Sequence, residues 1–221
     1  MVSKNMLVRI ATSLVLAPLV LTIIYFNNII FDFMMFSLAG IMFYEWYELT
    51  VKNNHQSPVK WKLVGILYVG LPCTALIWII DQSNGHIVVL WILMVVWATD
   101  TFAYFFGKLI GGPKLAPRIS PNKTWSGLIG GISGAALVGF FMKDYLFKQD
   151  HLLFISLNII LAIYAQIGDL IESWVKRRFN FKDSGSIIPG HGGILDRVDG
   201  LTIVAPKIAL LLMLDNSHYF L

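Results

Sequence analysis

The stretch IVVLWILMVVWATDTFAYF, residues 87–105, decides the fold of this chain. It runs without a charge as far as Asp100, and its length is close to the roughly 20 apolar residues with which an α-helix crosses a bilayer. A soluble core would be built from shorter apolar stretches, and a strand of a membrane barrel would alternate apolar and polar residues. The stretch therefore predicts a membrane-spanning helix with one carboxylate near its end.

Further apolar runs of similar length occupy most of the chain. The candidate spans are Leu7–Phe26, Ile29–Leu49, Trp61–Ile80, Ile87–Phe105, Thr124–Met142, Leu152–Trp174 and Ile194–Leu214. Of the 221 residues, 57% are hydrophobic and only 14% are charged, and the mean hydropathy is +0.69, which is far more apolar than a soluble domain. We therefore predict an all-α integral membrane protein, a polytopic bundle of about seven transmembrane helices.

Lysine and arginine gather in alternate loops of this arrangement. With the N-terminus inside, the cytoplasmic basic residues are Lys4, Arg9, Lys52, Lys60, Lys62, Lys108, Lys114, Arg118, Lys123, Lys176, Arg177, Arg178 and Lys182, against Lys143 and Lys148 outside. Short cytoplasmic loops retain such residues, so the N-terminus is expected in the cytoplasm. Because the positive charge is spread over loops between spans, we expect phosphate on a lipid or nucleotide as its partner, and no nucleic acid.

The same topology collects acidic residues near the cytoplasmic ends of three helices. These residues are Asp100, Asp169, Glu172, Asp196 and Asp199. Carboxylates beside apolar segments are costly unless they are paired, solvated or metal-bound, so the cluster is a candidate functional site.

Two pairs within this cluster have helical spacing. Asp169 and Glu172 are three residues apart, as are Asp196 and Asp199, and this spacing turns both members of a pair toward one face. Two such faces could oppose each other and hold Mg²⁺, which prefers carboxylate oxygens and is usually shared with substrate phosphates. The alternative is that these carboxylates form structural ion pairs, for example Asp196 with Arg197.

A glycine-rich loop precedes the last span. It reads Pro189, Gly190, His191, Gly192 and Gly193, and it follows a basic run. Free backbone amides at a helix N-terminus bind anions, and glycine lets a phosphate approach the backbone. His191 could add a hydrogen bond to phosphate, although a lone histidine is more often structural.

A second polar segment lies between the fourth and fifth predicted spans. Ser120, Lys123 and Thr124 supply hydroxyls and an ammonium at an expected helix start, which suits a nucleotide phosphate. Equally, Ser120 or Asn122 could be an ordinary N-cap and Lys123 an interfacial side chain.

Other residues of the spans suggest packing and support. The fifth span carries Gly127, Gly130, Gly131 and Gly134, a pattern of small residues that lets helices approach closely. In the second span, Glu45 and Glu48 are candidates to support the acidic site from behind.

The segment from Ser173 to Asp199 resembles the signature of the phosphatidate cytidylyltransferases, also called CDP-diacylglycerol synthases. The matching residues are Ser173, Lys176, Arg177, Lys182, Asp183, Pro189, His191, Gly192, Gly193, Asp196, Arg197 and Asp199. An earlier segment resembles the family through Asp100, Ala103, Tyr104, Gly107, Lys114, Pro117, Ser120, Pro121, Lys123, Thr124 and Gly127, and Gly168 with Asp169 adds to the likeness. The resemblance covers roughly the C-terminal half in detail.

This resemblance implies transfer of a cytidylyl group from CTP to phosphatidic acid, giving CDP-diacylglycerol and pyrophosphate, with Mg²⁺ and room for a second metal ion. It implies one transmembrane catalytic domain over residues 1–221, with N-terminal spans in 1–86 and the active site in 87–221. It further implies a multi-pass protein of the bacterial inner membrane with a cytoplasmic active site, and a homodimer as one assembly.

The resemblance also assigns roles to residues. The expected catalytic residues are Asp169, Asp196, Asp199 and Lys176, and the expected metal ligands are Asp169, Asp196, Asp199 and Asp100. The expected substrate-binding residues are Ser120, Lys123, Thr124, Lys182, His191, Gly192, Gly193, Arg197 and Tyr104.

Two other functions are compatible with the residues alone. Membrane kinases and phosphosugar transferases that act on polyprenyl phosphates also combine aspartates, lysines and several spans. A proton- or ion-coupled transporter would use Glu45, Asp100 and Asp169 as a relay, although transporters usually place their sites near the midplane and show internal repeats.

Overall fold

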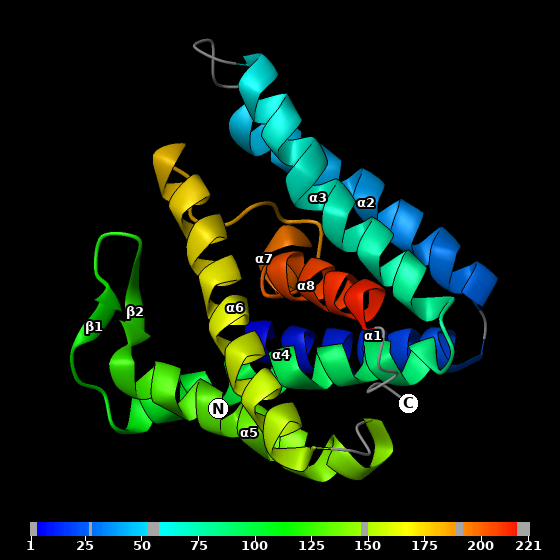
Figure 1. Cartoon of the computed structure of the whole chain (residues 1–221). Helices are drawn as coiled ribbons and strands as arrows, with labels where there is room; N and C mark the ends of the chain where they lie inside the picture. Colours follow the sequence, from blue (N-terminus) through cyan, green and yellow to red (C-terminus); the bar gives the residue numbers. More distant parts are fainter. Residues whose placement is uncertain (1–3, 27, 53–57, 147–149, 189–191, 216–221) are drawn as a thin grey trace.

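The chain folds into a bundle of helices with one small β-hairpin (Figure 1). The computed structural model describes residues 4–26, 28–52, 58–146, 150–188 and 192–215. The elements are α1 (Lys4–Phe26), α2 (Asn28–Thr50), α3 (Pro58–Ile80), α4 (Gly85–Leu109), β1 (Lys114–Ala116), β2 (Ser120–Thr124), α5 (Trp125–Leu146), α6 (His151–Arg178), α7 (Leu195–Val198) and α8 (Leu201–Leu214). The predicted all-α class is therefore confirmed.

The helices long and apolar enough to cross a membrane number five among the described residues, namely α2 to α6. Leu14–Phe26 within α1 and the whole of α8 are shorter apolar helices. The predicted seventh span, Ile194–Leu214, is wrong as one continuous helix because it is divided into α7 and α8. At about 1.5 Å per residue, the 14 residues of α8 reach roughly 21 Å, less than the hydrocarbon thickness of about 30 Å.

A hairpin replaces the expected loop between α4 and α5. Strands β1 and β2 pair antiparallel, with Lys114 opposite Thr124 and Ala116 opposite Ser120. Helix α5 begins only at Trp125, and the Thr124 hydroxyl accepts a hydrogen bond from the backbone N–H of Gly127 at 3.1 Å. Thr124 is thus the residue that caps α5, so neither Ser120 nor Asn122 has that role.

Helices α4 and α5 lie side by side and pack closely (Figure 1). A Cβ atom added at Gly131 would lie 2.9 Å from the Thr99 carbonyl oxygen, and one at Gly134 would lie 2.9 Å from that of Ala98. The predicted packing role of these glycines is therefore confirmed, because a larger residue would meet the backbone of α4.

Polar contacts inside the bundle join helices at fixed depths. The indole N–H of Trp91 on α4 donates to Asn158 Oδ1 on α6 at 2.9 Å, and both residues are buried. On the other side, the indole N–H of Trp46 on α2 donates to the Trp61 carbonyl on α3 at 2.8 Å. Because lipid offers no hydrogen bonds, such paired groups fix the relative depth of the helices that carry them.

The C-terminal elements lie in the middle of the bundle. Helix α8 packs against α3, α6 and α4, and α7 precedes it between α2 and α6 (Figure 1). Near the middle of α8, the Lys207 ammonium lies 5.4 Å from the ring centroid of Tyr164 on α6. After α6 the chain thus returns to the centre of the bundle. There Asp196 contacts α6, and Asp199 lies near Asp100 of α4 and Asp169 of α6.

Gly131→Ala should destabilise the protein because its methyl group would press on the Thr99 carbonyl. The expected cost is about 1–3 kcal/mol, typical of overpacking, and a lower midpoint of thermal unfolding in detergent would report it. The matched control is Gly70→Ala on α3, where an added Cβ meets nothing within 4 Å. Equal midpoints for the two variants would contradict the close α4–α5 contact.

Candidate active site

A cavity of about 1430 Å³ runs through the bundle and joins two chemically different regions. All four predicted acidic ligands line it, namely Asp100, Asp169, Asp196 and Asp199, together with Lys123, Lys176 and Arg197. The apolar remainder of the lining comes mainly from α1 to α4. The cavity therefore has one charged end and one hydrocarbon-like end.

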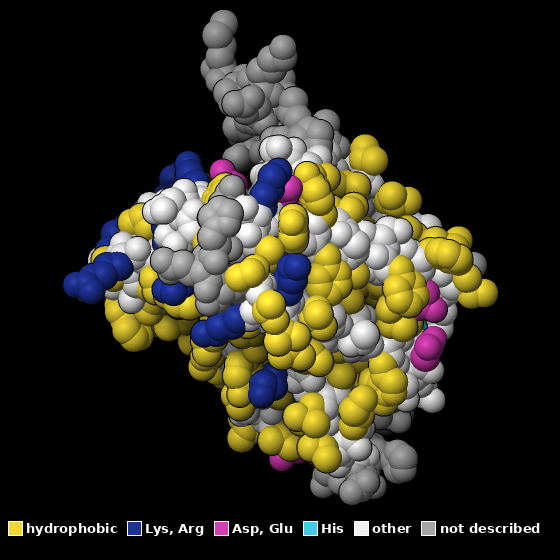
Figure 2. All heavy atoms as spheres, turned by 90° about the horizontal axis from the view of Figure 1, so that it is seen from above, with side chains coloured by type: hydrophobic (Ala, Val, Ile, Leu, Met, Phe, Trp, Pro, Cys, Tyr) yellow, Lys and Arg dark blue, Asp and Glu magenta, His cyan; other side chains and the backbone are white. Residues whose placement is uncertain are grey.

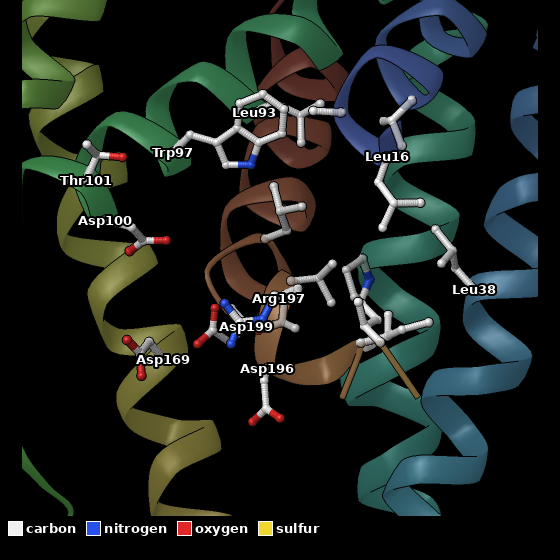
Figure 3. A pocket seen from close by; sticks show the side chains of 18 of the residues that line it. Leu16, Leu38, Leu93, Trp97, Asp100, Thr101, Asp169, Asp196, Arg197 and Asp199 are labelled. Carbon is white, nitrogen blue, oxygen red and sulfur yellow. Dashed lines mark hydrogen bonds between the residues drawn. The ribbon is translucent and has the colours of Figure 1, made fainter. Parts of the chain in front are cut away.

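Three of the carboxylates turn toward one another at the charged end. Asp100 comes from α4, Asp169 from α6 and Asp199 from the junction of α7 and α8, and Figure 3 shows them around a shared space beside Arg197. All three side chains line the same cavity. The prediction that these three helices bring their acids together is thus confirmed.

Lys123 ties the β-hairpin to this carboxylate group. Its ammonium lies 2.5 Å from Asp169 Oδ2 and donates to Gln166 Oε1 at 3.1 Å. The Gln166 amide nitrogen in turn donates to Asp100 Oδ1 at 3.4 Å, and the Ser173 hydroxyl donates to Asp169 Oδ1 at 3.2 Å. Lys123 is therefore part of the site rather than an interfacial side chain.

Asp196 has a different environment from the other three aspartates. Its Oδ1 accepts from the Lys176 ammonium at 2.6 Å, and its Oδ2 accepts from the Ser184 N–H and hydroxyl at 2.9 Å each and from the Gly193 N–H at 3.0 Å. In Figure 3 it points away from Asp100, Asp169 and Asp199. Four protein donors thus share its two oxygens, against one donor at each oxygen of Asp169, so Asp196 is the less available of the two to a metal ion, and its predicted metal role stays a prediction.

The two predicted acidic pairs, Asp169 with Glu172 and Asp196 with Asp199, are each separated in the structure. Lys176 lies between Asp196 and Glu172, whose Oε1 is 3.1 Å from the same ammonium. Asp169 and Asp199 instead lie with Asp100 around their shared space. Asp196 therefore pairs with Lys176 on α6, and not with the neighbouring Arg197, which is exposed and lines the cavity.

The backbone amides from Gly193, at the end of the glycine-rich loop, to Leu195 are already hydrogen-bonded. The Gly193 N–H donates to Asp196, and the N–H groups of Ile194 and Leu195 donate to Glu45 on α2 at 3.0 and 2.9 Å. The predicted phosphate cradle at Gly193 thus holds a carboxylate of the protein. Gly192 has a φ of 83°, a left-handed conformation that favours glycine. The backbone conformation is therefore sufficient reason for a glycine at this position.

The remaining predicted substrate residues lie in several places. Tyr104 and Thr124 line the cavity, and Tyr104 is 61% exposed. Ser120 lies at the start of β2 and Lys182 is exposed, and neither lines the cavity. His191 lies outside the described residues. The structure therefore groups Tyr104, Lys123, Thr124 and Arg197 with the carboxylates.

Two residues were missed or undervalued by sequence reasoning. Gln166 is 5% exposed and bridges Asp100 and Lys123, and its only sequence signal is its place three residues before Asp169, on the same helix face. Glu45 is 2% exposed and binds the loop before α7, whereas Glu48 pairs with the exposed Lys52 at 2.8 Å and does not support the site.

The donor set at the charged end suits a hard cation. Among the described residues, no three acidic, histidine or cysteine side chains are close enough to form a complete metal site. Mg²⁺ does not need one, because it keeps several waters and is bound through one or two carboxylates together with substrate phosphates. Asp169 and Asp199 are the residues of this end that could hold such an ion.

Basic side chains gather on one side of the molecular surface. Figure 2 shows them mainly in one half of this face, toward the side of the β-hairpin, with hydrophobic side chains over much of the rest. The exposed basic residues of this part of the chain are Lys108, Lys114, Arg118, Arg177, Arg178 and Lys182. The Arg177 Nε–H donates to the Ile119 carbonyl at 3.3 Å and so connects the hairpin to the end of α6.

Comparisons with known proteins agree with these features. The sequence model of the Cytidylyltransferase family matches residues 53–215. A protein of Rickettsia bellii named phosphatidate cytidylyltransferase is 40% identical over 211 residues, which cover 92% of this chain and 89% of the relative. A Brucella abortus protein of the same name is 34% identical over 251 aligned positions, covering 94% and 93% of the two chains. The chain therefore belongs to the cytidylyltransferase family.

Proposed function

We propose that this protein transfers the cytidylyl group of CTP to phosphatidic acid and so forms CDP-diacylglycerol and pyrophosphate. The observation that carries the proposal is a continuous cavity with a charged and an apolar end. One substrate is a polyanion and the other joins a phosphate to two acyl chains, so both fit one continuous space only if its polarity changes along its length. The family membership and the names of the relatives support the same reaction.

The chemistry asks for alignment more than for proton transfer. A phosphate oxygen of phosphatidic acid attacks the α-phosphorus of CTP, the bond to the oxygen that bridges the α- and β-phosphorus breaks, and pyrophosphate leaves with that electron pair. Because the nucleophile is already an anion, no general base is needed. The protein's contribution is then to orient two anions and to stabilise the charge that they bring together.

The residues at the charged end divide into two proposed roles. Asp169 and Asp199, with Asp100 beside them, would hold Mg²⁺, and the ion would neutralise charge on the triphosphate and its leaving group. Lys123 and Arg197 would contact phosphate oxygens. Lys176 and Asp196 would keep the loop and α7 in place, since their contacts are with each other and with the protein.

The apolar end is the proposed place for the acyl chains. It is lined by residues of α1, α2 and α3, including Leu16, Phe31, Leu38 and Leu76. A lipid bound there can present its phosphate to the carboxylates while its chains stay in an apolar environment. The basic side chains near the hairpin favour the cytoplasmic side of the bacterial inner membrane for the charged end of the cavity, by the charge bias of short loops. Association into a homodimer stays a prediction from the resemblance.

The reaction itself gives the first test. Purified protein incubated with labelled CTP, phosphatidic acid and Mg²⁺ should release pyrophosphate and form a labelled liponucleotide. A polyprenyl phosphate offered in place of phosphatidic acid should give no labelled lipid. Transfer from ATP to a polyprenyl acceptor, without any liponucleotide from CTP, would favour the kinase or phosphosugar transferase reading and reject the proposal.

Asp169→Asn should lower kcat by about 100-fold or more, because it removes a charge at the position where the triphosphate is neutralised. The variant should still insert and purify. The matched control is Asp144→Asn, at the far end of α5, where the carboxylate is exposed and lies 3.4 Å from His151. Wild-type turnover by Asp169→Asn would remove the proposed metal role of this residue.

Removal of divalent cations gives an independent test of the same role. Excess chelator should abolish turnover, and added Mg²⁺ should restore it, since carboxylates alone repel the triphosphate. Isothermal titration should show that CTP binds more weakly after chelation. Undiminished turnover in the presence of chelator would contradict the proposed use of Mg²⁺.

A further inference from the structure

Glu45 is a buried carboxylate that binds a segment about 150 residues away in the sequence. Its Oε1 accepts from the Ile194 N–H at 3.0 Å and its Oε2 accepts from the Leu195 N–H at 2.9 Å. The Ser184 hydroxyl lies 3.4 Å from Oε2. With a side chain only 2% exposed, this carboxylate is tolerated because backbone and hydroxyl donors from the opposite segment compensate it.

The opposite segment is shaped around this carboxylate. A Cβ atom at Gly185 would lie 2.7 Å from Glu45 Oε1, and one at Gly193 would lie 2.8 Å from either carboxylate oxygen. Side chains at both positions would push Glu45 out of its place. Because neither glycine has a side chain, the backbone at Gly185 and at Gly193 can lie close to the Glu45 carboxylate.

The contact leads directly to the charged end of the cavity. Leu195 is the first residue of α7, Arg197 follows two residues later, and Asp199 stands just after the helix. Glu45 itself does not line the cavity, whereas Arg197 and Asp199 do. Any shift of the α7 backbone would therefore move a proposed phosphate contact and a proposed metal ligand together.

We propose that Glu45 is a positioning residue, which fixes α7 through the Ile194 and Leu195 amides and so sets the places of Arg197 and Asp199. The inference rests on the proposed function for its effect on turnover. Its structural part stands on these hydrogen bonds alone. Glu45 precedes the region 53–215 that matches the family model. Its hydrogen bonds to Ile194 and Leu195 therefore connect α2, which lies before that region, to the site.

The test compares Glu45→Gln with Glu48→Gln on the same helix. Glu48 pairs only with exposed Lys52 among its charged neighbours in the described chain, so its loss should leave α7 unchanged. In Glu45→Gln a side-chain NH₂ group replaces one carboxylate oxygen. This group is a donor, like the backbone N–H that it meets, so the hydrogen bond from Ile194 or from Leu195 is lost. Hydrogen exchange of a peptide over residues 192–200 should become at least about tenfold faster than in the wild type and in Glu48→Gln.

Turnover should follow the same pattern. The kcat of Glu45→Gln should fall about 10- to 100-fold, because small displacements of reacting groups are costly, while KM for phosphatidic acid changes less than about threefold. The thermal midpoint should stay near that of Glu48→Gln. Wild-type exchange and kcat in Glu45→Gln would overturn the proposal, and so would parallel losses in midpoint, kcat and both KM values, which mark a purely structural role.

A second variant covers the case in which Glu45→Gln does not fold. Gly185→Ala keeps the charge but displaces the carboxylate, and it should give the same fast exchange at residues 192–200 and the same fall in kcat. A folded Gly185→Ala protein with wild-type exchange would overturn the proposal. The exchange readout needs no catalysis, so it can succeed or fail even if the wild-type protein forms no CDP-diacylglycerol, which separates this inference from the proposed function.

Discussion

The carboxylate of Asp196 is the junction on which the C-terminal half of the structure depends. It binds the Lys176 ammonium from α6 and three donors from Ser184 and Gly193, so one side chain joins the end of a long helix to both arms of the following loop. Hydrogen bonds to a charged group are about twice as strong as neutral ones. These hydrogen bonds hold the described ends of the loop against α6 and α7.

Glu45 also binds the described part of this segment. Two acidic side chains, one on α2 and one on α7, thus occupy the amides of Gly193, Ile194 and Leu195. With these donors satisfied inside the protein, Asp199 is left at the junction of α7 and α8 to face Asp100 and Asp169. The number of donors explains the different roles of these carboxylates. A carboxylate that accepts from several protein donors is held in place, whereas one with few donors remains available to a ligand.

Much of the fold follows from the sequence, because apolar runs and small-residue spacing report on lipid and on helix contact directly. The helices α2 to α6 and a close helix contact made by α5 were predicted on this basis, whereas the identity of its partner, α4, comes from the structure. The fate of individual carboxylates could not be predicted in the same way. Helical spacing puts Asp196 and Asp199 on one face, but the partners that separate them, Lys176 and Ser184, lie 20 and 12 residues away. Long-range donors of this kind leave no local pattern.

The two ends of the cavity also differ in stiffness. At the charged end, ion pairs and hydrogen bonds fix the side chains of Lys123, Asp169 and Gln166. At the other end, the wall includes Met34, Met35 and Met42, whose unbranched side chains change conformation easily. A bound molecule can therefore vary in bulk at its hydrocarbon end while its head meets the same rigid frame. Such a site is selective for the group at one end of its ligand and permissive toward the other.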